Sequence, residues 1–171
     1  MAQRDLQGRE SAPGERSAHA FFFFLTGLQG HVLMLEGRTP TYPPASGADV
    51  EALLSVWAAG DMRLRVGDVV TFYPFVTDQS QSIRVRMAGI IQPRDMNEDF
   101  WLGHKEYFLP TRDSGGQSRT FGLYVPEEQF FAALGDRFPV LPVNYWWIAT
   151  VEPSNVKASD AARIRQAITD L

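Results

Sequence analysis

The chain has 171 residues, a net charge of -4 and no cysteine. This length suits one compact unit, with room for two small lobes that share an interface. Hydrophobic residues make up 44% of the chain and aromatic residues 12%, which is enough for a sizeable core and excludes wholesale disorder. The acidic balance argues against a nucleic-acid partner, and the lack of cysteine excludes disulfide scaffolds, thiolate metal sites and cysteine nucleophiles.

The first residues differ in composition from the rest of the chain. Residues 1–18 mix charges of both signs and have no apolar periodicity, so we predict a flexible tether there. They also lack the apolar segment of a secretory signal peptide. The longest apolar runs, 20–25 and 145–151, are far shorter than the roughly 20 residues that span a bilayer. We therefore expect a soluble domain, either a cytosolic protein or an excised piece of a longer one.

Short aromatic and β-branched runs predict the strands. The four phenylalanines at 21–24 suit a doubly buried strand, because aromatic side chains pack well on a pleated surface. The turn signature Val66-Gly67-Asp68 and the alternation that begins at Ile83 predict a hairpin of strands 69–76 and 83–93. The other predicted strands are 32–35, 50–55, 107–109, 120–125 and 145–151.

Three short helices are predicted from capping residues. Ser55 is placed to cap a helix over 56–62, and a proline followed by two acids opens a second helix over 126–134. Ser159 caps the third, 159–171, whose apolar residues form one stripe. About seven strands and three short helices without regular βαβ alternation indicate an α+β fold with mixed, mainly antiparallel sheets.

The most tempting enzymatic signal is Asp113-Ser114-Gly115-Gly116, because trypsin-like proteases place their nucleophile in a Gly-Asp-Ser-Gly-Gly context. However, Arg112 replaces the first glycine, and the chain is too short for the two barrels of such a protease. We interpret the segment as a flexible loop. No Gly-x-Ser-x-Gly elbow and no phosphate-binding glycine loop occurs, so we expect no catalytic residue and no cofactor site.

A second candidate is a metal loop. Asp95, Asn97 and Asp99 have the spacing of the first calcium ligands, and Glu106 falls at the twelfth position. Because Phe100 holds the position that requires glycine, we expect a solvated acidic loop and no metal site. The histidines share no ligand-like spacing either; they are His19, His31 and His104.

Tyr145, Trp146 and Trp147 form an aromatic run that is a candidate interaction surface. We interpret the run as core with a half-exposed edge, and the alternative is a platform for a ligand. On that alternative, the chain is a secreted or cytosolic module that binds a small ligand or glycan through this strand. An undiagnosed hydrolase is a third hypothesis.

The order of several glycine-containing motifs carries a resemblance. Glu36-Gly37-Arg38 precedes a strand–helix unit, Val66-Gly67-Asp68 follows it, and the next hairpin leads through Ala88-Gly89-Ile90 to Trp101. In this order and spacing they resemble the extracytoplasmic domain of FtsX-like permeases, above all the MacB-like periplasmic core domain. The resemblance covers roughly 21–171 and departs from the family at Ala88, where the family has valine. The three central glycines suit positive φ or close backbone approach, and Asp68 can cap its own turn, so these roles are structural.

The resemblance implies a non-catalytic domain, residues 19–158, of an ABC transporter permease. It would lie at the extracytoplasmic face of the bacterial cytoplasmic membrane, and helix 159–171 would be a stalk toward the next membrane span. A separate ATPase subunit would bind the ATP, so the domain itself would hold no cofactor. The implied function is coupling of ATP-driven transmembrane motion to substrate export or to an envelope protein. The implied partners are the ATPase subunit, a second permease copy and an envelope protein.

Overall fold

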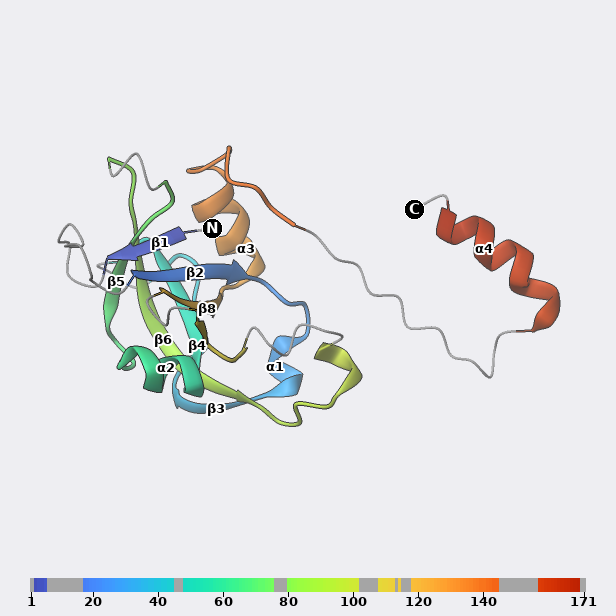
Figure 1. Ribbon diagram of the computed structural model, residues 1–171, viewed down its shortest axis with the longest axis horizontal. Helices are drawn as coiled ribbons and strands as arrows, with labels where there is room; N and C mark the ends of the chain where they lie inside the picture. The colour runs from blue at the N-terminus through green and yellow to red at the C-terminus, as the bar shows by residue number, and fades with distance from the viewer. Residues whose placement is uncertain are drawn as a thin grey trace.

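The computed structural model describes residues 2–5, 17–44, 48–75, 80–101, 108–112, 114, 118–144 and 157–169. Within them the chain forms a mixed β-sheet with short helices around it, which confirms the predicted α+β class (Figure 1). The strands are β1 (Ala2–Asp5), β2 (Ser17–Phe23), β3 (Val32–Gly37), β4 (Val50–Ser55), β5 (Val69–Tyr73), β6 (Ile83–Pro93), β7 (Thr111–Arg112) and β8 (Ser118–Tyr124). The helices are α1 (Leu28–His31), α2 (Val56–Met62), α3 (Glu127–Gln129), which continues as a π-helix over Phe130–Gly135, and α4 (Ala161–Thr169).

The sheet closes on itself. Strands follow one another in the order β2, β1, β5, β6, β4, β8, and β8 pairs back with β2. Strand β3 branches from β6, and β7 extends from β8. The pairs β2–β8 and β4–β6 are parallel, whereas the other pairs are antiparallel. The expected mixed, mainly antiparallel arrangement is therefore confirmed, including the hairpin of β5 and β6.

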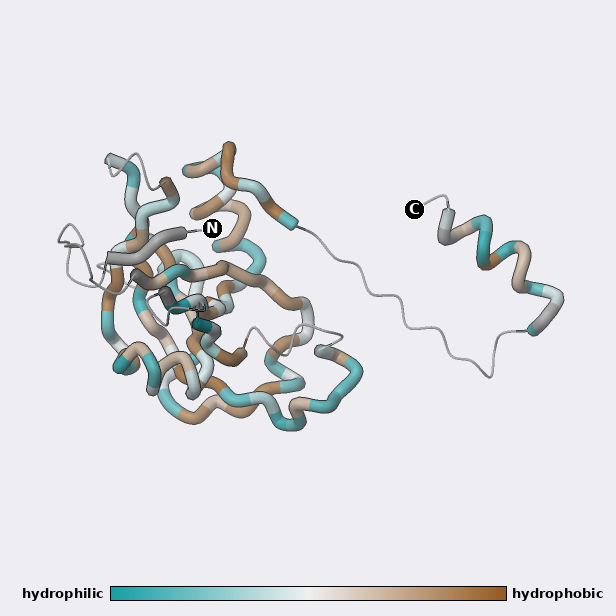
Figure 2. Tube along the Cα trace, in the orientation of Figure 1, coloured by the Kyte–Doolittle hydropathy of each residue, from teal (hydrophilic) through white to brown (hydrophobic). Residues whose placement is uncertain are grey.

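Strand β4 lies at the centre of this architecture, between β6 and β8. All six of its residues are buried, because one face of the strand points into the closed sheet and the other is covered from outside. Leu54 packs in the interior of the closed sheet, and its neighbour Leu53 packs in a second, outer cluster. In Figure 2 brown, hydrophobic stretches lie along several strands and also on the loop after the π-helix.

The outer cluster joins α1 to the outside of β4, β6 and β8. Trp101 is its largest buried member and donates a hydrogen bond from Nε1 to the Asp95 carbonyl at 2.6 Å. Phe108 stacks on Tyr124, with ring centroids 4.8 Å apart. The full set of buried residues in this cluster is Leu28, Val32, Leu53, Ile91, Trp101, Phe108 and Tyr124.

Two predictions about the chain's local structure were wrong. We predicted a flexible tether over 1–18, but Ala2–Asp5 is a strand that pairs with β2 and β5. Its backbone hydrogen bonds need no apolar pattern in the sequence. The predicted strand 107–109 is absent at 108–109, because Phe108 is buried in the outer cluster and its carbonyl accepts the Ser55 hydroxyl. The predicted strand 145–151 lies outside the described residues.

The C-terminal helix begins slightly later than predicted. A single 3₁₀ turn over Ala158–Asp160 contains Ser159, and regular α4 starts at Ala161. The last residues of the predicted apolar stripe lie outside the described side chains. No helix in the described part of the chain has the length and apolar character needed to cross a membrane.

The predicted cap at Ser55 is confirmed and ties α2 to the core. The Ser55 hydroxyl accepts the Ala58 amide at 3.1 Å and donates to the Phe108 carbonyl. Ser55 is 1% exposed, so neither backbone group finds water if the hydroxyl is removed.

Ser55→Ala should therefore lower the free energy of unfolding by about 2–3 kcal/mol, the sum of a lost cap and an unpaired buried carbonyl. Urea denaturation of both proteins measures the difference. A loss below about 0.5 kcal/mol would contradict this role of the hydroxyl.

Candidate functional site

The three motif segments that carry the resemblance meet in the structure, although they are far apart in sequence. Gly37, at the end of β3, lies opposite Gly89 of β6 in the antiparallel register. The Arg38 amide donates to the Ala88 carbonyl at 2.9 Å, and the Gly67 amide donates to the Met87 carbonyl at 2.8 Å. We call this meeting point, residues 36–38, 66–68 and 87–89, the motif junction.

Glycine is required at the motif junction for two physical reasons. Gly37 has a φ of +79°, and a Cβ added there would lie 2.2 Å from the Ala88 carbonyl oxygen. A Cβ at Gly89 would lie 2.7 Å from the Met34 sulfur and 2.9 Å from the Arg38 carbonyl oxygen. These glycines therefore let two backbone segments touch, as expected from the sequence.

The turn before β5 also has the expected local structure. Gly67 has a φ of +93°, and the Asp68 carboxylate accepts the Arg65 amide at 2.8 Å. The Asp68 carbonyl accepts the Met87 amide at 2.9 Å, which anchors the turn to β6. The other two motif residues have different surroundings: Glu36 is exposed on β3, and Trp101 lies in the outer cluster, apart from the junction.

Arg38 connects the motif junction to a buried acid that the sequence analysis missed. Its guanidinium donates from Nη1 and Nη2 to the two carboxylate oxygens of Glu51, at 2.8 and 2.6 Å. Glu51 lies on β4 and is completely buried, whereas the Arg38 side chain is 49% exposed. The hydrogen bonds that it donates to Glu51 raise the pKa of the Arg38 guanidinium, so Arg38 stays positively charged.

Two further residues complete a network around Glu51. Thr41 donates its amide and its hydroxyl to the Glu51 carboxylate, at 3.0 and 3.2 Å. Gln129, which is also fully buried, accepts the Glu51 amide at 2.7 Å and donates to the Thr41 carbonyl at 2.7 Å. A buried carboxylate is tolerated only when it is paired and hydrogen-bonded in this way. The network therefore fixes the loop after β3, strand β4 and helix α3 to one another.

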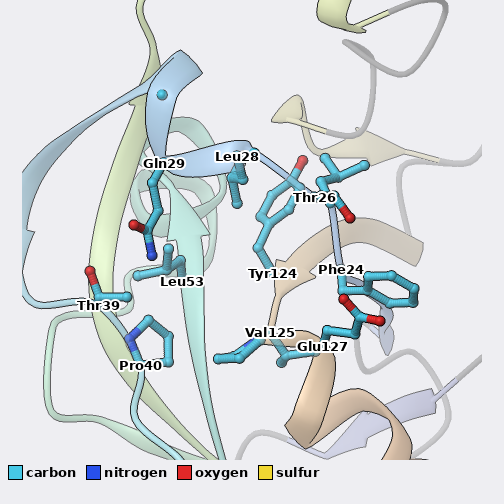
Figure 3. Close-up of a pocket in the computed structure, with 14 residues that line it drawn as sticks. Phe24, Thr26, Leu28, Gln29, Thr39, Pro40, Leu53, Tyr124, Val125 and Glu127 are labelled. Carbon is cyan, nitrogen blue, oxygen red and sulfur yellow. The ribbon is translucent and has the colours of Figure 1, made fainter. Parts of the chain in front are cut away.

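A pocket of about 340 Å³ opens beside this network (Figure 3). Leu28, Leu53, Tyr124 and Val125 are among its apolar lining residues. In Figure 3 Gln29 and Thr39 lie on one side, with Thr26, Phe24 and Glu127 on the opposite side. The remaining residues that line it are Leu25, Gly27, Gly30, Pro40 and Pro126.

Tyr124 presents its ring to this pocket, and its hydroxyl is buried without a hydrogen-bond partner among the described residues. Burial raises the pKa of the Tyr124 hydroxyl, so the group stays protonated. The walls of the pocket thus carry one negative charge, on Glu127, among the described residues that line it.

Asp95 and Asn97, two of the candidate calcium ligands, lie in one turn. The Asp95 carboxylate accepts the Asn97 amide there at 2.8 Å. The loop is held by His31, which hydrogen-bonds Glu98 at 2.6 Å and stacks on Phe100. Within the described residues no acidic or histidine side chains gather into a metal-binding group. Glu106 and His104 lie outside the described residues.

Among the described residues, the other candidates do not line the pocket and do not belong to the motif junction. Ser114 is exposed at a turn next to β7, while Asp113, Gly115 and Gly116 lie outside the described residues. His19 is on β2 and half-buried. The aromatic run Tyr145, Trp146 and Trp147 lies outside the described residues, so its role as an interaction surface stays a prediction.

Gly37→Ala should lower the free energy of unfolding by about 2–4 kcal/mol, because alanine meets both an unfavourable φ and the Ala88 carbonyl. Gly60→Ala is the matched control, since Gly60 lies within α2 and has no atom within 4 Å of an added Cβ. Gly60→Ala should leave the free energy of unfolding unchanged or raise it by up to about 1 kcal/mol. Equal effects in urea denaturation would contradict the close approach at the junction.

Comparisons with known proteins leave the function to be argued from these residues. No family model matches the chain, and no match is found among curated proteins or solved structures.

Proposed function

We propose that this chain is a non-catalytic extracytoplasmic domain of an FtsX-like ABC transporter permease. In this role it couples ATP-driven motion of membrane spans to substrate export or to an envelope protein. A separate ATPase subunit binds the nucleotide, and the permease acts as a dimer at the outer face of the bacterial cytoplasmic membrane. Helix α4 leads toward the next membrane span.

The observation that carries the proposal is the motif junction. The motifs on which the resemblance rests come from three separate segments. Gly37 and Gly89 pack against each other across β3 and β6, and the Gly67 amide donates to the Met87 carbonyl of β6. Their shared structural role supports the interpretation that they define a common fold.

A domain that transmits force must resist deformation, and the closed sheet supports this requirement. Among the described strands, each member of the closed path β2, β1, β5, β6, β4, β8 pairs with a neighbour on both sides. The Glu51 network fastens the loop after β3 to β4 and α3. Movement applied at one end of such a body is passed on as a rigid rotation instead of being absorbed by bending.

The most direct test of the proposed function is to determine on which side of the membrane the domain lies. Because this chain contains no cysteine, one introduced cysteine is the only labelling site in it. Gly60→Cys places a thiol at an exposed position with no atom within 4 Å of its Cβ. The complete protein, expressed in a bacterium with other cysteines replaced, should react with a membrane-impermeant maleimide in intact spheroplasts. We expect the same extent of labelling in intact spheroplasts as in lysed ones.

A single cysteine engineered into the ATPase subunit is the control, and it should react only after lysis. If Cys introduced at Gly60 also reacted only after lysis, the domain would face the cytoplasm and the proposed function would be wrong.

A further inference from the structure

The pocket has the features of a binding site, and no role has yet been given to it. Its volume of about 340 Å³ is roughly twice that of a 150 Å³ cavity that holds benzene. Most of its inner surface is aliphatic or aromatic, from Leu28, Leu53, Val125 and the Tyr124 ring. An apolar body of about the size of a phenylalkyl group would lie against this surface.

The walls of the pocket are held in place before any ligand binds. Arg38 donates from Nη1 to the Thr39 carbonyl at 3.0 Å while it is bound to Glu51. On the other side, the Val125 amide donates to the Phe23 carbonyl at 2.8 Å, and the Phe130 amide donates to the Pro126 carbonyl at 3.0 Å. A preformed pocket does not pay the entropy of ordering its walls during binding.

The charge on the wall selects the kind of ligand. Glu127 is the charged member of the described lining, and it is exposed with no ion pair to a described residue. The Phe24 ring lies on the same side of the pocket, but it packs against Phe130 and Phe131, with ring centroids 5.0 and 5.5 Å apart (Figure 3). The preference therefore rests on the Glu127 carboxylate, which favours a cation and disfavours an anion. Gln29 and Thr39 provide neutral hydrogen-bonding groups on the opposite side.

We propose that this pocket binds a small organic cation, an ammonium group carried on an apolar body. The apolar body lies on Leu28, Leu53 and Val125, and the ammonium group lies at Glu127. This inference does not depend on the proposed permease function, and it adds a ligand-binding role to the domain.

The test is a titration of the ¹⁵N-labelled chain by NMR with two matched probes, 4-phenylbutylamine and 4-phenylbutyrate, at neutral pH and low salt. The amine should bind in the low millimolar range, as expected for a ligand of this size. The carboxylate should bind about five- to tenfold more weakly. The amide signals that shift most should be those of residues 24–30, 39, 53, 125 and 127.

Glu127→Gln should weaken binding of the amine about two- to fivefold, as expected for an exposed ion pair. Glu128→Gln is the matched control, because this neighbouring acid is exposed but does not line the pocket. It removes the same charge from the whole protein and should leave the affinity within about 1.5-fold.

Three results would each overturn the proposal: equal affinity for the amine and the carboxylate, equal effects of the two substitutions, or shifts centred on another surface. The comparison of the two probes uses the unaltered chain, so it holds whatever the substitutions do to stability. None of these results would bear on where the domain lies relative to the membrane.

Discussion

A single buried carboxylate organises this protein. Glu51 is the charged residue of a strand that is otherwise apolar apart from its capping serine, and it is completely buried. Its burial is possible because a guanidinium, a backbone amide and a hydroxyl all bind it. Removing the Arg38 guanidinium would leave a desolvated charge without a counter-ion, which is a large penalty in a folded protein. The chain around Glu51 is therefore constrained to one arrangement.

The Glu51 network links the motif junction to the pocket. Arg38 belongs to the motif junction through its backbone and to the Glu51 network through its side chain. The same network holds Thr39 at one wall of the pocket, and Gln129 connects it to α3, whose first residue forms the opposite wall. The motif junction and the pocket therefore depend on the same hydrogen bonds, so a substitution at Arg38 would affect both.

Much of this fold could be predicted from local sequence signals. The hairpin of β5 and β6, the buried strand Val50–Ser55, the Ser55 cap and the glycines of the motif junction each have a physical signature within a few residues. Strand β1 has none, because its four residues are held by pairing with β2 and β5. A strand that lacks an apolar or alternating pattern, and is held by pairing with distant segments, cannot be predicted from its own residues.

The Glu51 network and the pocket were missed for a related reason. An acid in the middle of an apolar strand was the available signal, and it becomes informative only when Arg38 and Gln129 are known to reach it. The pocket is built from segments that the sequence separates by up to about one hundred residues, so no short motif describes it. Short-range sequence signals predict helices, strands and turns. A site that forms only when the sheet closes can be located only in the structure.

A double-mutant cycle on Arg38 and Glu51 tests the organising role of this pair most directly. Arg38→Met, Glu51→Gln and the double variant would each be unfolded in urea, and the three changes in unfolding free energy compared. We expect each single change to cost about 2–4 kcal/mol and the double change to cost about 2 kcal/mol less than their sum, because the charge left unpaired in the Arg38→Met protein is then absent. If the effects of the two single substitutions summed to the effect of the double substitution within about 0.5 kcal/mol, the organising role of the pair would be contradicted.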